Sequence, residues 1–166
     1  MTHKLFAAAL MCILGINICK AQLSDSSSSK WGGNSFGSQL SIEMNTNVIT
    51  IGSKLTFQCR VRNTSTNDIF FSVTDPKYDF QISVFNDSGK TYQLSPNPAT
   101  QAVFLNPLMH KLSPGETYEQ AVTLKIDGDI VPGNYKLKCR FTFYVNTSKN
   151  NGGHELESNI IEVQII

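Results

Sequence analysis

Two segments of the sequence alternate apolar and polar residues, and each carries a cysteine in its apolar set. Between positions 133 and 143 the apolar residues are Tyr135, Leu137, Cys139, Phe141 and Phe143. Between positions 54 and 62 they are Leu55, Phe57, Cys59 and Val61. A period of two residues predicts strands with one buried face, so both cysteines are expected to point into the interior.

The arrangement of the two cysteines predicts the fold class. Inward-facing cysteines on one early and one late strand are typical of an immunoglobulin-type sandwich, in which they join the two sheets. Further strands are predicted, between turn signals, at 39–44, 48–51, 69–74, 80–86, 91–94, 117–126 and 158–166. We therefore predict an all-β, immunoglobulin-like antiparallel β-sandwich of about seven to nine strands. Residues 95–111 and the loop around His154 are expected to be irregular.

The first 21 residues have the pattern of a secretory signal. A basic residue at Lys4 precedes an apolar run at 5–18 and a small-x-small site at 19–21. The run is shorter than the roughly 20 apolar residues that a spanning helix needs, and it contains Asn17. A lipid anchor on Cys19 competes with cleavage, but Ile18 does not fit the small residue usual before such a cysteine. We predict a cleaved signal peptide at 1–21 and a secreted protein in the periplasm, on the cell surface or outside the cell.

Cleavage of this signal leaves Cys59 and Cys139 as the two remaining cysteines. An exported chain meets oxidising conditions, so we predict a disulfide bond between them, with two buried free thiols as the alternative. Closing such a loop stabilises the fold by roughly 2 to 5 kcal/mol.

The mature chain is predicted to divide into a tail and one domain. Residues 22–38 are rich in serine and glycine and are interpreted as a flexible leader, in which Trp31 and Phe36 are either stray aromatics or a partner contact. Residues 39–166 form the predicted sandwich domain, and 40% hydrophobic content fits one soluble core.

Charge and motifs argue against several function classes. The formal net charge is +1, so no nucleic-acid partner is expected. The mature histidines, His110 and His154, belong to no recognisable catalytic or metal-binding motif. We predict a non-enzymatic protein with no cofactor, no metal and no membrane span.

Charged residues are expected on the outer faces of the two strands. Lys136, Lys138 and Arg140 form one basic row, and Glu162 on the last strand is a candidate partner for it. Arg60 and Arg62 form another row, on the other predicted sheet, so the two rows are not expected to merge.

Three glycosylation sequons begin at Asn63, Asn86 and Asn146, and their use depends on the source.

A family resemblance covers about residues 54–143. The segments VRNTSTNDIFFSV, YDFQISVFNDSGKTYQLS, LSPGE and VPGNYKL occur in the order found in the bacterial intracellular proteinase inhibitor (BsuPI-like) family, which the chain resembles. The resemblance implies an immunoglobulin-like fold and the possibility of proteinase inhibition. This chain departs from the family in its secretion signal, its cysteine pair and the lack of tryptophan in TYQLS.

Two functions follow as expectations. The favoured one is a secreted, non-catalytic sandwich that binds another macromolecule or serves in envelope or surface assembly. The alternative is a proteinase inhibitor that presents the loop 98–107, in which Val103, Phe104 and Leu105 lie between prolines. Those three residues otherwise fill the core or form a short strand.

Overall fold

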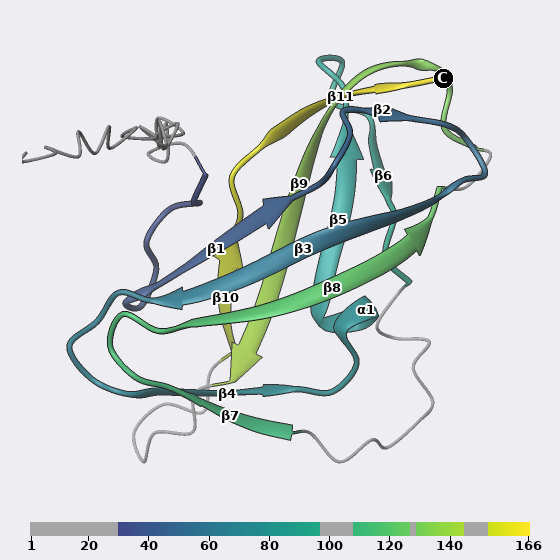
Figure 1. The fold of residues 1–166 in the computed structure, drawn as a ribbon. Helices are drawn as coiled ribbons and strands as arrows, with labels where there is room; N and C mark the ends of the chain where they lie inside the picture. The colour runs from purple at the N-terminus through teal and green to yellow at the C-terminus, as the bar shows by residue number, and fades with distance from the viewer. Residues whose placement is uncertain (1–29, 97–107, 127–128, 145–152) are drawn as a thin grey trace, which may run out of the picture.

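A computed structural model of the chain describes residues 30–96, 108–126, 129–144 and 153–166. Within these residues it contains eleven strands and one short helix, arranged as two packed sheets with a small third sheet at one end (Figure 1). The strands are β1 (Ser38–Glu43), β2 (Val48–Ile49), β3 (Lys54–Asn63), β4 (Ile69–Val73), β5 (Phe80–Phe85), β6 (Thr91–Gln93), β7 (Leu108–Leu112), β8 (Thr117–Lys125), β9 (Gly133–Tyr144), β10 (Gly153–Glu157) and β11 (Ile161–Ile165). The helix is α1 (Pro76–Asp79). The predicted all-β, immunoglobulin-like sandwich is confirmed.

Two of the strands lie where the sequence predicted irregular chain. β7 falls within and just beyond 95–111, and β10 contains His154. Each is stabilised by a partner distant in sequence, since β7 pairs with β4 and β10 pairs with β9. Tertiary pairing of this kind overrides weak local patterning. With these two additions, nine predicted strands become eleven.

The smaller of the two main sheets has the order β1-β3-β8 and is antiparallel. Cys59 in the middle of β3 lies opposite Ile42 on β1 and Gln120 on β8. The larger sheet has the order β2-β11-β9-β5-β6, and β10 also pairs with β9. The parallel pairing of β11 with β2 is the exception to an otherwise antiparallel sheet.

The core lies between these two sheets and is built from the alternating residues of β3, β5 and β9. Aromatic rings pack together in it where β4 meets β9. Phe80 and Phe141 stack with their ring centroids 4.5 Å apart, and Phe71 meets Phe141 edge-on at 5.9 Å. Burial of each such side chain contributes roughly 1.5 to 3 kcal/mol, so this packing holds β4 of the third sheet against the larger sheet.

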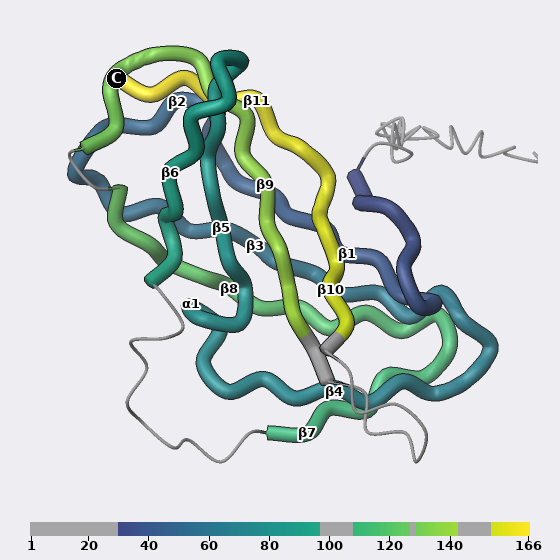
Figure 2. The backbone as a smooth tube through the Cα atoms, turned by 180° about the vertical axis from the view of Figure 1, so that it is seen from behind, coloured from purple at the N-terminus to yellow at the C-terminus, as the bar shows by residue number. Residues whose placement is uncertain are grey.

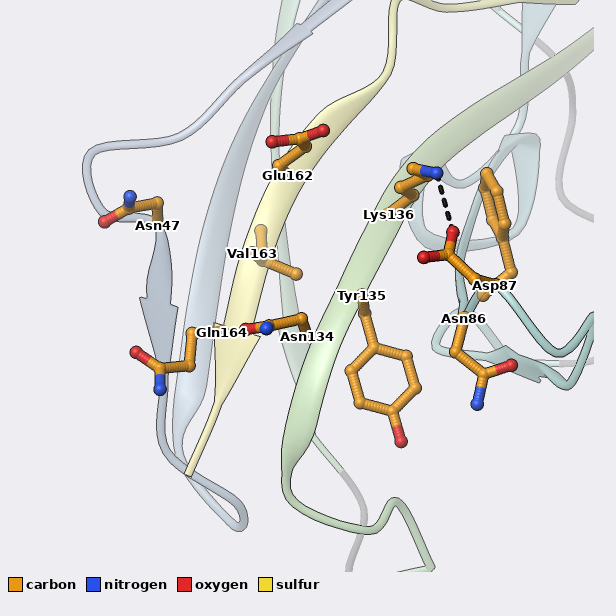
Figure 3. A pocket seen from close by; sticks show the side chains of 10 residues that line it. Asn47, Asn86, Asp87, Asn134, Tyr135, Lys136, Glu162, Val163 and Gln164 are labelled. Atoms are coloured by element: carbon orange, nitrogen blue, oxygen red, sulfur yellow. Dashed lines mark hydrogen bonds and ion pairs between the residues drawn. The ribbon is translucent and has the colours of Figure 1, made fainter.

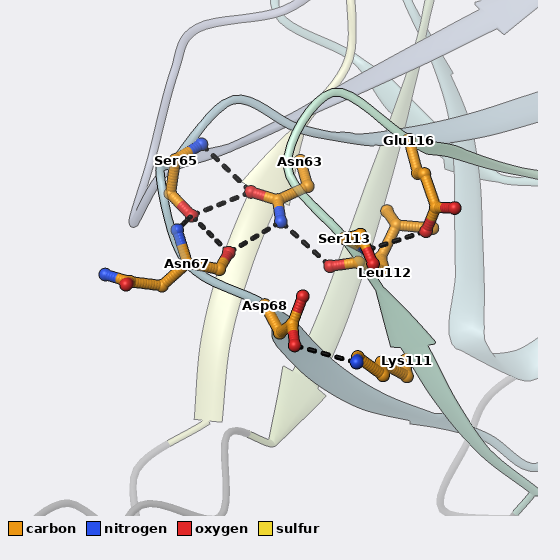
Figure 4. Close-up of polar contacts among 8 residues, drawn as sticks. All are labelled: Asn63, Ser65, Asn67, Asp68, Lys111, Leu112, Ser113 and Glu116. Carbon is orange, nitrogen blue, oxygen red and sulfur yellow. Dashed lines mark hydrogen bonds and ion pairs between the residues drawn. The ribbon is translucent and has the colours of Figure 1, made fainter.

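The third sheet is a continuation of the first. β3 and β8 run as a paired ribbon, turn a corner, and continue as β4 and β7, which cross the lower end of the sandwich (Figure 2). Asn63 lies at the corner and is fully buried. Its side-chain nitrogen donates to the carbonyls of Asn67 and Leu112, both at 2.8 Å, and its oxygen accepts from the Ser65 N–H and hydroxyl (Figure 4). One amide thus fastens both arms of the ribbon.

The outer edge of β1 is covered by residues from both ends of the domain. The Gly32 N–H donates to the Leu40 carbonyl, and the Asn159 side-chain amide bonds both the N–H and the carbonyl of Ile42. The Arg62 guanidinium lies over the ring of Trp31, 4.3 Å from its centroid. Residues 30–37 of the predicted leader therefore pack on the sandwich instead of hanging free, while 22–29 lie outside the described residues, as does the predicted signal.

Candidate functional site

A polar hollow of about 470 Å³ lies on the outer face of the larger sheet, and we call it the sheet groove (Figure 3). Three strands and two loops contribute to it. Its lining residues are Asn47, Phe85, Asn86, Asp87, Asn134, Tyr135, Lys136, Glu162, Val163 and Gln164. Asparagine, glutamine and charged side chains thus make up most of its wall.

The register of β5, β9 and β11 brings these side chains together. Lys136 on β9 lies opposite Phe85 on one side and Glu162 on the other. Asn134 lies opposite Gln164 in the next row along the sheet. Because alternate residues share one face of a strand, both rows project outward.

The loop before β2 adds Asn47 to the second row. The Gln164 N–H donates to the Asn47 carbonyl at 2.7 Å, which holds this loop against β11. The side chains of Asn47, Gln164 and Asn134 lie along one wall of the sheet groove in Figure 3. Three amides from separate parts of the sequence are therefore brought together.

Two of the three charged side chains that line the sheet groove form an ion pair, and the third is Glu162. The Lys136 ammonium lies 2.7 Å from Asp87 Oδ1, in the loop that follows β5. This hydrogen bond raises the pKa of Lys136 and lowers the pKa of Asp87, so both groups are charged near neutral pH. An exposed pair of this kind adds little stability, but it cancels the local charge.

A second hollow, of about 150 Å³, lies further along the same face. Its lining residues are Gln81, Ser83, Thr91, Gln93, Lys138, Cys139 and Arg140. The cations here are also paired, with Lys138 2.5 Å from Glu157 and Arg140 2.9 Å from Glu155. Amide, hydroxyl and paired charged groups thus extend along the outer face of β9.

The two predicted basic rows lie where the sequence placed them. Lys136, Lys138 and Arg140 project from β9 in the larger sheet, and Arg60 and Arg62 belong to β3 in the smaller one. Arg60 is bridged by Glu43 at 2.8 Å and Glu119 at 2.9 Å. Glu162 lies opposite Lys136 as expected, but the direct ion pair of Lys136 is with Asp87.

The predicted disulfide partners meet in the core. Cys59 and Cys139 are both fully buried, on different sheets, and both carry free thiols in the structure. Burial raises the pKa of the Cys139 thiol well above its usual range, and a hydrogen bond with the Cys59 thiol raises it further. The inward orientation is confirmed, and the covalent bond stays a prediction.

The predicted inhibitory loop lies outside the described residues, and with it Val103, Phe104 and Leu105. In β7, which follows this loop in the sequence, Leu108 and Met109 are exposed. His110 is partly buried and stacks on Phe71 at 5.4 Å, while His154 contacts the Phe36 ring at 3.9 Å. The structure therefore separates the two histidines, one on β7 and one on β10.

The sequons differ in their surroundings. The Asn63 side-chain nitrogen, which would carry a glycan, donates two hydrogen bonds in the buried corner, so this sequon is incompatible with glycosylation of the folded chain. Asn86 is half-exposed beside the sheet groove, and Asn146 lies outside the described residues.

Searches against known proteins give fold similarity alone. No family model matches the sequence, and no curated protein is similar to it. The C-terminal domain of wzt is 14% identical, with 82% of this chain and 76% of that one covered and a TM-score of 0.49. The CARDB domain of PF1109 from Pyrococcus furiosus is 12% identical (81% and 95% covered, TM-score 0.37). The ASH/PapD-like domain of human CEP192 is 16% identical (75% and 84% covered, TM-score 0.34).

The sheet order of the described residues makes the chain an immunoglobulin-like β-sandwich module. Similarity at these levels transfers no activity to it. Within the described residues, no helix has the length and apolar character needed to cross a membrane.

Proposed function

We propose that the chain is an exported, non-catalytic binding module whose binding site is the sheet groove and the adjoining outer face of β9. The sequence supports export through the pattern of residues 1–21. The observation that carries the binding site is the gathering of Asn47, Asn134 and Gln164, whose side-chain amides form no hydrogen bonds within the described part of the chain. Polar side chains that line a hollow and do not stabilise the fold are typical of a ligand-binding site.

Several buried polar side chains elsewhere in the described chain have structural roles instead. The Asn63 amide forms hydrogen bonds at the corner, the Asn159 amide bonds the edge of β1, and the Ser95 hydroxyl bonds the backbone of β5. These side chains stabilise the fold, because loss of their bonds would leave buried backbone groups unpaired. Replacement of the groove amides would leave no buried backbone group unpaired, so it should not lower the stability of the fold. A loss of binding in such variants can therefore be told apart from a loss of stability.

The test compares binding to envelope material from the cells that produce the protein. Asn134→Ala and Gln164→Ala are expected to weaken binding about 2- to 10-fold each, the net value of one hydrogen bond, with unchanged melting temperature. Gln58→Ala is the matched control, since this exposed amide lies on the outer face of β3 in the other sheet. Equal binding by wild type, control and both groove variants would contradict the proposed site.

Proteinase inhibition is the alternative that the family resemblance suggests. It would use the loop 98–107, which comes directly before β7 in the sequence. A panel of proteases of each class tests it directly: stoichiometric inhibition that is lost in Phe104→Ala would support an inhibitor, and absence of inhibition would remove the alternative.

A further inference from the structure

The groove amides have a hydrogen-bonding capacity of one particular kind. Each side chain of Asn47, Asn134 and Gln164 offers two N–H donors and one carbonyl acceptor. A hydroxyl group is likewise both donor and acceptor, so a ligand rich in hydroxyls can use both ends of every amide. The second hollow has the same chemistry, since Gln81, Gln93, Ser83 and Thr91 line it.

The charges on this face do not favour a charged ligand. Lys136, Lys138 and Arg140 are each within 2.9 Å of a carboxylate oxygen. Glu162 adds a further negative charge beside Lys136. An anionic polymer would have to displace these carboxylates and would meet no net positive field, so electrostatic attraction is absent from this described face.

The sheet groove also differs from a typical protein-binding surface. Protein interfaces rely on aromatic and aliphatic anchors that fill apolar pockets. Among the exposed apolar side chains, Phe70, Leu108 and Met109 belong to β4 and β7, at the other end of the sandwich in Figure 1. Those nearer the sheet groove do not line it: Val48, Val131, Ile160 and Ile166. In the sheet groove Val163 is buried and Phe85 is half-buried in the wall. Its recognition capacity is therefore mainly hydrogen bonding.

The shape of the surface fits a chain more than a single small molecule. The outward residues of β9 run from Asn134 to Arg140, and both hollows lie along them. At about 3.3 Å per residue, this track is about 20 Å long. A ligand that fills both hollows must be extended.

We infer that the ligand of this face is a neutral glycan chain, whose hydroxyls bond the groove amides and whose backbone follows β9. This inference rests on the proposed binding function and adds the chemical class of the ligand to it. Phe85 gives the track one aromatic surface, opposite Lys136.

The experiment treats one batch of envelope material in two ways before the binding assay. Sodium periodate cleaves the vicinal diols of sugars, and proteinase K removes polypeptide. We expect periodate to abolish binding of the wild type and of Gln58→Ala. We also expect binding to untreated material to change by less than about twofold from about 50 to about 500 mM salt, because the ligand is uncharged.

The outcomes separate the ligand class from the function. Binding that survives periodate but is lost after proteinase K overturns the glycan inference and leaves the binding function standing. A fall in binding of more than about tenfold over the same salt range also overturns it, because it shows an ionic ligand. Absence of wild-type binding to untreated material contradicts the proposed function itself. Soluble glycans can also be added as competitors of binding. The neutral glycans dextran and mannan are expected to compete, whereas the anionic polygalacturonate is not.

Discussion

Cys59 on β3 and Cys139 on β9 are free thiols that belong to one core, where the two main sheets face each other. Each comes from a strand whose alternating pattern buries it completely. No other pair of described residues could be joined as a disulfide, because these two are the cysteines of the described chain. In an oxidising compartment, these two thiols are therefore the pair that can form a disulfide bond within the described chain.

Oxidation of this pair is expected in the exported protein. Titration of the denatured, unreduced protein should find no free thiol, and reduction should lower the free energy of unfolding by roughly 2 to 5 kcal/mol. Two titratable thiols in protein taken from its native compartment would contradict the prediction. In the reduced protein, alkylation of Cys139 should be slow until the chain unfolds, because burial raises the pKa of its thiol and keeps it protonated.

The corner amide is expected to be essential to the ribbon. Asn63→Ala removes the donors to the Leu112 and Asn67 carbonyls and should destabilise the fold by about 1 to 3 kcal/mol. Asn63→Asp should be worse at neutral pH, because it places a carboxylate against two carbonyl oxygens. Its folded pKa would be raised, so the stability of this variant should recover as the pH falls.

Urea unfolding at two pH values checks the corner prediction. Asn134→Asp is the matched control, since the same change on the exposed wall of the sheet groove should leave stability nearly unchanged. An Asn63→Asp variant as stable as this control near neutral pH would show that the corner does not depend on the amide.

Asp79 is expected to make stability depend on pH. Burial raises its pKa above the ordinary value of 3.8, against the opposing effect of hydrogen bonds from the N–H groups of Thr74 and Asp75. Because the folded pKa exceeds the unfolded one, its contribution to stability is greatest below the ordinary pKa. That contribution falls as the pH rises through the folded pKa.

Asp79→Asn tests this dependence. Both N–H groups donate to the same oxygen, Oδ2, so one amide oxygen can accept both bonds without a charge. The stability of the variant relative to wild type should therefore rise from about pH 3 to about pH 7, measured by urea unfolding at each pH. If the difference in free energy of unfolding between the variant and wild type stayed constant over this range, the titration of Asp79 would not contribute to the pH dependence of stability.

The fold was predictable because the alternation of apolar and polar residues within each strand shows which of its faces is buried. Ile161, Val163 and Ile165 alternate in the sequence and face the interior in β11, just as the two cysteine-bearing strands do. The sheet groove was not predictable in this way. Asn47, Asn134 and Gln164 lie in three separate segments, and only the register of β11 against β9 and β2 brings them together. Register is set by long-range pairing, which no local pattern in a single sequence reveals.

The packing of residues 30–37 escaped prediction for a related reason, since it depends on contacts with residues distant in sequence, among them a close approach at Gly32. A Cβ on Gly32 would lie 1.8 Å from the Glu157 carbonyl oxygen, whereas a Cβ on Gly33 would have no atom within 4 Å. Gly32→Ala should therefore push this segment off the sandwich and uncover the edge of β1. Gly33→Ala should leave it in place.

Trp31 reports this change directly, because it is the one tryptophan in the sequence and stacks under Arg62. We expect Gly32→Ala to shift its fluorescence emission to the red, since the ring becomes exposed to water, and to lower stability by about 1 to 3 kcal/mol. Gly33→Ala should keep the wild-type spectrum. If Gly32→Ala gave the same emission as wild type, Trp31 would still lie under Arg62, and the packing of the segment would not depend on the close approach at Gly32.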